Sequence, residues 1–145
     1  MILPDVNLLL YAVDAVSPRN AAARRWVEER LSGPETVAMA WSVLTAFVRL
    51  STHPSIFLEP LTSEQAFDLI DGWLRQPSVV IVHPGDRHHI IMRELLEPLG
   101  TAGNLVPDAH LAALALEHGA TLASSDHDFA RFAGLRWTDP LAGRA

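Results

Sequence analysis

Residues 107–129, "PDAHLAALALEHGATLASSDHDF", are the most informative part of the sequence, because a helical segment, a short apolar run and two acids follow directly on one another there. Pro107 suits the first turn of a helix and Gly119 suits a left-handed helix C-cap, so this spacing predicts a helix over 107–118. The apolar run at 120–124 predicts a buried strand. Asp126 follows that strand, which places a carboxylate beside its carboxyl end.

The rest of the chain repeats this alternation of strand and helix. Its apolar runs are unbroken, which is typical of strands buried on both faces of a parallel sheet. We therefore predict a single domain, 1–145, with a three-layer α/β/α fold and a central parallel sheet of four to five strands. The strands are expected at residues 1–5, 36–40, 79–82 and 120–124, with a short edge strand within 134–139. The other helices are expected at 7–14, 18–32, from about 42, 62–74 and 87–97, with Pro18 opening the second of these.

The composition predicts a folded, soluble protein in a reducing compartment. Of 145 residues, 49% are hydrophobic and 19% charged, and there is no cysteine, so disulfides and thiolate chemistry are excluded. The N-terminal run is interrupted by Pro4, Asp5 and Asn7 and has no basic segment before it, so we expect no signal peptide and no membrane anchor. These features favour a cytoplasmic location.

The charge balance limits how the chain could bind nucleic acid. The net charge is −6, which argues against an extended basic surface, and apart from histidine every basic residue is arginine. A nucleic-acid substrate would therefore have to be held locally, by individual arginines and by a cation bound to acidic side chains.

Three acids far apart in the sequence are predicted to meet. Asp5 and Asp126 end or follow strands, and Asp108 lies in the first turn of a helix that runs antiparallel to the strands, so all three belong at the carboxyl edge of the sheet. Singly, each has a structural explanation, as a helix cap or as a partner of a helix dipole. Together they would repel one another, which suggests a bound cation. Oxygen ligands without cysteine favour Mg²⁺ or Mn²⁺.

The same residues carry a resemblance to a known family. The chain resembles PIN domains, and more narrowly the ribonuclease toxins of VapBC toxin–antitoxin systems, through "DVNLLLYA" at 5–12, "GNLVPDAHLAALALEHGATL" at 103–122 and "SSDHDF" at 124–129. The resemblance implies that Asp5, Asp108 and Asp126 bind the metal. It also implies that Asp128 takes part in catalysis and that Asn7 and Ser124 support the ligands.

One position departs from the family pattern. The family usually has a glutamate three residues before the arginine of its second motif, and here "TAFVRL" keeps Arg49 but has Ala46 at the acid's position. This difference leaves open whether one metal or two would bind. Thr45, beside the gap, either holds a metal-bound water or is a plain helix residue, and the latter is the better default.

The resemblance also implies an activity and partners. It implies an Mg²⁺- or Mn²⁺-dependent endoribonuclease that leaves 5′-phosphate and 3′-hydroxyl ends, a VapB-type antitoxin that covers the site, and a homodimer. A phosphatase of the haloacid-dehalogenase type is disfavoured, because it needs a second acid where Asn7 stands and a catalytic lysine, which the chain lacks. The remaining alternative is a PIN-fold binding module that is inactive because Ala46 replaces the acid.

Overall fold

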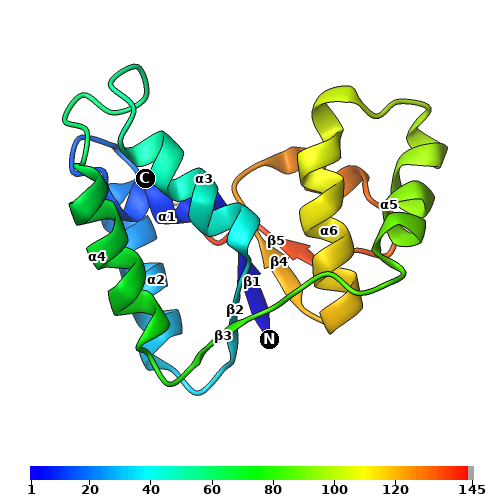
Figure 1. Ribbon diagram of the computed structural model, residues 1–145, viewed down its shortest axis with the longest axis horizontal. Helices are drawn as coiled ribbons and strands as arrows, with labels where there is room; N and C mark the ends of the chain where they lie inside the picture. Colours follow the sequence, from blue (N-terminus) through cyan, green and yellow to red (C-terminus); the bar gives the residue numbers. More distant parts are fainter. Residues whose placement is uncertain (144–145) are drawn as a thin grey trace.

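Five parallel strands form one sheet in the computed structural model, which describes residues 1–143 (Figure 1). The predicted α/β/α fold with a parallel sheet is confirmed, and the edge strand near the C-terminus is present. The last two residues of the predicted 1–145 domain lie outside the described residues. The strands are β1 (Ile2–Pro4), β2 (Val37–Met39), β3 (Val79–Ile81), β4 (Thr121–Ala123) and β5 (Trp137–Thr138).

The order of the strands creates a switch point in the middle of the sheet. The order is β3-β2-β1-β4-β5, so the chain moves outward from β1 in one direction and returns to its other side with β4. Pro4 pairs with Ala123, and the amide of Asp5 continues the ladder by donating to the carbonyl of Ala123 at 2.8 Å. The carboxyl ends of β1 and β4 therefore lie side by side, which is where open parallel sheets bind ligands.

The helices lie in two groups on either side of the sheet (Figure 1). Right-handed crossovers place the helices that precede β3 on one face and those that follow it on the other. The first group is α1 (Val6–Val13), α2 (Asn20–Ser32), α3 (Trp41–Ser51) and α4 (Ser63–Leu74). The second group is α5 (His88–Leu96) and α6 (Val106–His118), together with the short 3₁₀ helices η1 (Glu97–Leu99) and η2 (Gly103–Leu105).

Local sequence signals explain some of the helix ends. Thr62 and Gln65 form a complete capping box at the start of α4, and Gly119 ends α6 with a φ of 63°, as predicted. The predicted start of α2 was wrong: the helix begins at Asn20, and Pro18 lies in the preceding turn. Asn20 donates from its side chain to the carbonyls of Tyr11 and Ala12, so a contact with α1 sets this boundary rather than the proline.

The core surrounds the middle of α6. Residues 111–115 are buried on successive positions of the helix, because small alanines let it pack closely against neighbours on several sides. A helix held in this way fixes the position of Asp108 in its first turn.

Among the aromatic side chains, Phe47, Phe57 and Trp73 are buried, whereas Trp41 is 50% exposed. Within residues 1–143, no helix has the length and apolar character needed to cross a membrane.

Candidate functional site

Asp5 occupies the turn between β1 and α1. Its backbone is extended and it is the N-cap of α1, with Oδ1 accepting from the amide of Val6 at 2.7 Å. Its other oxygen, Oδ2, accepts a hydrogen bond of 2.8 Å from the Ser124 hydroxyl. The capping role expected for an isolated aspartate is therefore real, and it orients the carboxylate toward the end of β4.

Ser124 connects the ends of the two central strands. It is fully buried, and its hydroxyl oxygen accepts from the Asn7 side chain and from the amide of Asp126, both at 3.0 Å, while the hydroxyl donates to Asp5. The Trp137 indole adds a bond to the Ser124 carbonyl at 3.0 Å. Asn7 and Ser124 are thus bonded to each other, and Ser124 is also bonded to Asp5 and to the backbone of Asp126. The bond from Trp137 was not foreseen, because nothing in the local sequence of an edge strand indicates it.

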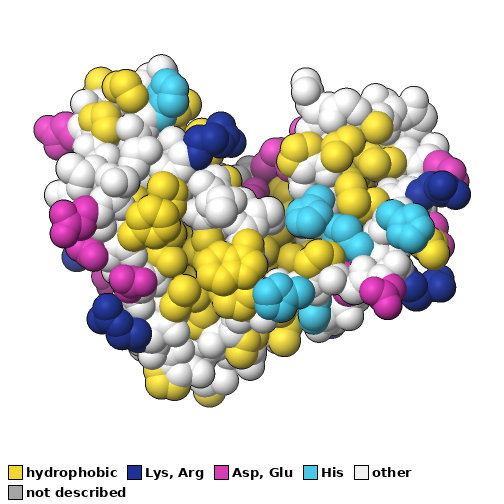
Figure 2. Space-filling view, viewed as in Figure 1, with side chains coloured by type: hydrophobic (Ala, Val, Ile, Leu, Met, Phe, Trp, Pro, Cys, Tyr) yellow, Lys and Arg dark blue, Asp and Glu magenta, His cyan; other side chains and the backbone are white. Residues whose placement is uncertain are grey.

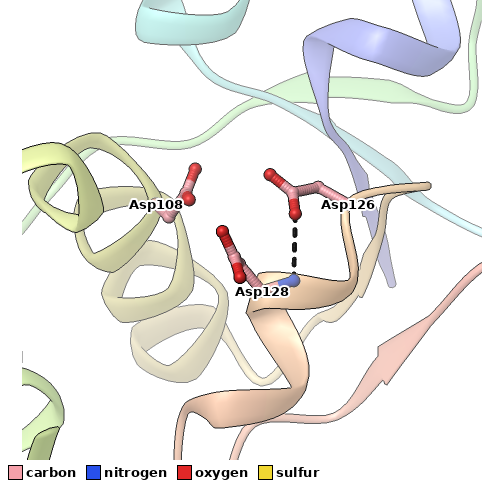
Figure 3. A group of neighbouring side chains, drawn as sticks. All are labelled: Asp108, Asp126 and Asp128. Atoms are coloured by element: carbon pink, nitrogen blue, oxygen red, sulfur yellow. Dashed lines mark hydrogen bonds between the residues drawn. The ribbon is translucent and has the colours of Figure 1, made fainter.

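Three carboxylates converge next to this connection (Figure 3). Asp108 extends from the first turn of α6, and Asp126 and Asp128 come from the start of η3 (His127–Arg131). Each offers an oxygen, and these atoms lie within 4.8 Å of one another. Asp126 Oδ1 also accepts from the amide of Asp128 at 2.9 Å, which caps η3 and fixes the two acids relative to each other.

The electrostatics of the site reflect burial and mutual repulsion. Burial, and after it the charges of Asp126, Asp5 and Asp128, together raise the pKa of Asp108 to about 6. Burial likewise raises the pKa of Asp5, although the hydrogen bonds from Ser124 and Val6 oppose it. Carboxylates whose ionisation is disfavoured by burial and by one another's charge form a site that a cation would stabilise.

A cavity of about 320 Å³ opens in front of these acids. Asp5, Asp108 and Asp126 line one side of it, and Ala46 and Arg49 of α3 line the other. Figure 2 shows this hollow between the two groups of helices, with acidic side chains inside it and a basic side chain on the opposite rim.

Thr45, the residue before Ala46, faces away from the acids. The hydroxyl of Thr45 donates to the carbonyl of Trp41 at 2.7 Å, and its side chain lines a separate apolar cavity between α3 and α4. The structure thus places Thr45 outside the cavity of the acids. Of its two expected roles, it is the plain helix residue and does not hold a metal-bound water. Ala46 lines that cavity, so the gap in the family motif corresponds to an apolar position in its wall.

Comparison with known sequences shows the family of this chain. Residues 2–135 match the PIN domain. Ribonuclease VapC37 of Mycobacterium tuberculosis is 47% identical over 142 residues, which is 98% of this chain and 99% of that protein. Ribonuclease VapC33 of the same species is 42% identical over 141 residues, covering 97% and 99% of the two chains.

Solved structures agree on the fold. A chain of VapBC2 from Rickettsia felis, in a complex with a promoter DNA fragment, has a TM-score of 0.69 at 22% identity and covers 95% of this chain and 98% of its own. VapC20 of M. tuberculosis, described as a toxin that cleaves the sarcin–ricin loop, has a TM-score of 0.62 at 20% identity, covering 94% and 99%. The match across residues 2–135 and the near full-length identity to VapC sequences establish that this chain belongs to the PIN-domain family, among the VapC ribonucleases.

Proposed function

We propose that this protein is a metal-dependent endoribonuclease that hydrolyses RNA phosphodiester bonds and is the toxin of a type II toxin–antitoxin pair. The observation that carries the proposal is the convergence of Asp108, Asp126 and Asp128 within 4.8 Å at the switch point of the sheet. Relatives that match nearly the whole chain are named ribonucleases, which supports the same activity here.

The side chains fit a hard divalent cation. Carboxylate oxygens are the donors that Mg²⁺ and Mn²⁺ prefer, and burial together with the neighbouring acids raises the pKa of Asp108, a cost of ionisation that such a cation would offset. Asp108, Asp126 and Asp128 would hold the ion. Asp5 lines the same cavity as Asp108 and Asp126 and would be a further ligand. A bound divalent ion would supply Lewis-acid polarisation of the phosphate and a lowered pKa for the attacking water.

The remaining groups of the cavity complete the proposed chemistry. Arg49 lines the wall opposite the acids. Its guanidinium can there form bidentate hydrogen bonds to two non-bridging phosphate oxygens of the RNA. Asp126 or Asp128 would orient the attacking water. Ser124 and Asn7 hold Asp5 and the Asp126 backbone in place.

Two variants and a matched control test the activity. Asp5→Ala and Asp108→Ala should each lower metal-dependent RNA cleavage at least about 10²-fold, because each removes a charge from the site of the reaction. Asp68→Asn, an exposed acid of α4, should cleave as the wild type does. Retained cleavage by Asp108→Ala, with the metal dependence of the wild type, would contradict the proposal.

The partner of the protein is proposed to be a VapB-type antitoxin that covers the acidic cavity in the cytoplasm. Similar folds occur in structures described as VapBC complexes, from Rickettsia felis and from Salmonella typhimurium. Co-expression with an antitoxin encoded next to this chain, followed by purification of the complex, tests this proposal. Recovery of free, active toxin from such cells would argue against it.

We also propose a homodimer that buries an apolar patch on α3 and α4. Trp41 and Phe67 are 50% and 54% exposed, and together with Arg49 and Asp71 they line a cavity of about 500 Å³. Figure 2 shows hydrophobic side chains gathered on this side of the molecule. Exposed patches of this kind are typical of protein interfaces. Trp41→Glu should convert a dimer into a monomer in sedimentation velocity, whereas Leu58→Glu, at an exposed leucine outside this cavity, should not.

The alternative function is that of an inactive binding module. The observation that favours it is Ala46, which places a methyl group in the cavity wall at the position of the family's glutamate. Titration of the wild type with Mn²⁺ in the absence of RNA separates the two proposals. Saturable binding that Asp108→Asn removes favours the nuclease, and no binding favours the module.

A further inference from the structure

Asp139, immediately after β5, makes hydrogen bonds to the loop that carries two of the clustered acids. Its Oδ1 accepts from the Ser125 hydroxyl at 3.1 Å, and its Oδ2 lies 3.1 Å from Nε2 of His127. Ser125 and His127 are the residues on either side of Asp126. The Asp139 carboxylate therefore bonds to the loop at two points that flank this acid.

The Asp139 side chain is itself firmly placed. It is only 6% exposed, and its Oδ1 also accepts from the amide of Leu141, whose side chain is buried in the core. Burial acts to raise the pKa of Asp139, but the hydrogen bonds from Leu141, His127 and Ser125 and the charge of Arg19 outweigh it and lower the pKa. Asp139 is therefore ionised at neutral pH and keeps its full capacity to accept hydrogen bonds.

The contact with Asp139 also explains the direction of His127. This residue lies between two acids in the sequence, yet its imidazole bonds to Asp139 and packs edge-on against the Trp137 ring, with 5.2 Å between ring centroids. The His127 side chain is 74% exposed, so apolar burial does not hold it there. The bond to Asp139 and the contact with Trp137 hold the loop from the side of β5, in addition to the hydrogen bonds that the amides of Asp126 and Asp128 donate.

We propose that Asp139 is a positioning residue, which holds the loop carrying Asp126 and Asp128 beside the end of β5, keeps their carboxylates next to Asp108, and thereby sets the affinity of the acidic cluster for its divalent cation. This inference rests on the proposed metal-dependent function. The physical reason is that like charges within 4.8 Å repel one another, so a loop without its bonds to Asp139 relaxes by moving the carboxylates apart. Partners that orient ligands in this way typically change metal affinity 10- to 100-fold when they are removed.

The test measures Mn²⁺ affinity without RNA, by calorimetry or by electron paramagnetic resonance of the free ion, together with thermal unfolding. Asp139→Ala should weaken Mn²⁺ binding about 10- to 100-fold. Asp139→Asn keeps an oxygen for Ser125 and Leu141 but loses the acceptor for His127, so it should weaken binding less. His127→Ala should resemble Asp139→Asn, because it removes the same bond from the other side.

A matched control separates positioning from general destabilisation. Asp14→Ala removes a carboxylate that accepts from the amide of Val16, next to α1 and away from the acids, and should leave Mn²⁺ affinity unchanged. RNA cleavage by Asp139→Ala should recover most of the wild-type rate at saturating Mn²⁺, which a loss of folded protein would not allow. If Asp139→Ala does not fold, Asp139→Asn and His127→Ala carry the same test.

Two results overturn the inference in distinguishable ways. If the wild type binds Mn²⁺ and the Asp139 and His127 variants bind it within twofold of the wild type, the positioning role is wrong and the proposed function stands. If the wild type does not bind Mn²⁺, both the proposed function and the role of Asp139 fall.

Discussion

Removing the charge of Asp108 should stabilise the metal-free protein while abolishing its stabilisation by metal. The pKa of Asp108 is raised from 3.8 to about 6, mainly by burial and then by the neighbouring acids. In a fully buried site this difference would correspond to about 3 kcal/mol. Because the side chain is partly exposed, solvent screening reduces the effect, and we expect about 1–2 kcal/mol.

The direction of the pH dependence follows from the same shift. Asp108 holds its proton more tightly in the folded state than in the unfolded state, so its contribution favours folding at low pH. The metal-free wild type should lose this contribution as the pH rises from about 4 to about 6, and it should not regain it above pH 6. Asp108→Asn has no carboxyl group at this position, so its stability should not show this loss.

The assay is thermal unfolding in a chelator, from pH 4 to pH 8, with Asp68→Asn as an exposed acid control. At pH 7.5 Asp108→Asn should unfold a few degrees above the wild type, since about 1 kcal/mol corresponds to roughly 2–4 °C in a chain of about this size. Mg²⁺ at ten times its dissociation constant should then stabilise the wild type by about 1.4 kcal/mol and the variant by nearly nothing.

Two outcomes would refute this reasoning. One is an Asp108→Asn variant that is no more stable than the wild type in chelator at pH 7.5. The other is an equal response of both proteins to Mg²⁺, which would mean that any bound ion lies elsewhere.

Three further substitutions probe the surroundings of the acids. Ala46→Glu adds a carboxylate to the cavity wall, so it should lower the stability of the metal-free protein by about 1 kcal/mol and tighten Mn²⁺ binding. Unchanged Mn²⁺ affinity in a titration would show that a side chain at this position does not reach the ion. Ser124→Ala leaves the Asn7 side chain and the Asp126 amide without their buried acceptor. Urea unfolding should therefore show a free energy of unfolding lower by about 2–3 kcal/mol, and a decrease below about 0.5 kcal/mol would contradict the connecting role of Ser124. Thr45→Ala should cleave RNA at the wild-type rate, because its hydroxyl bonds to the Trp41 carbonyl outside the cavity; a tenfold slower rate would return Thr45 to the site.

The sequence by itself determined the class of fold and the edge at which the acids gather. Unbroken apolar runs that alternate with amphipathic segments are enough to predict a covered parallel sheet, because only buried strands are apolar on both faces. Asp5 and Asp126 directly follow strands and Asp108 opens a helix, so their placement at one edge follows from chain direction alone.

Tertiary structure decided which of these acids lie closest together and what holds them there. The sequence grouped Asp5 with Asp108 and Asp126, whereas the structure brings Asp128 within 4.8 Å of the last two and binds Asp5 to Ser124 and Val6. The contacts of Asp139 with Ser125 and His127 were likewise invisible in the sequence. The physical reason is that local pattern fixes backbone class and burial, whereas the direction of a carboxylate also depends on distant hydrogen-bond partners. Ser124 becomes a neighbour of Asp5, and Asp139 a neighbour of Ser125 and His127, only when the strands take the order β1-β4-β5.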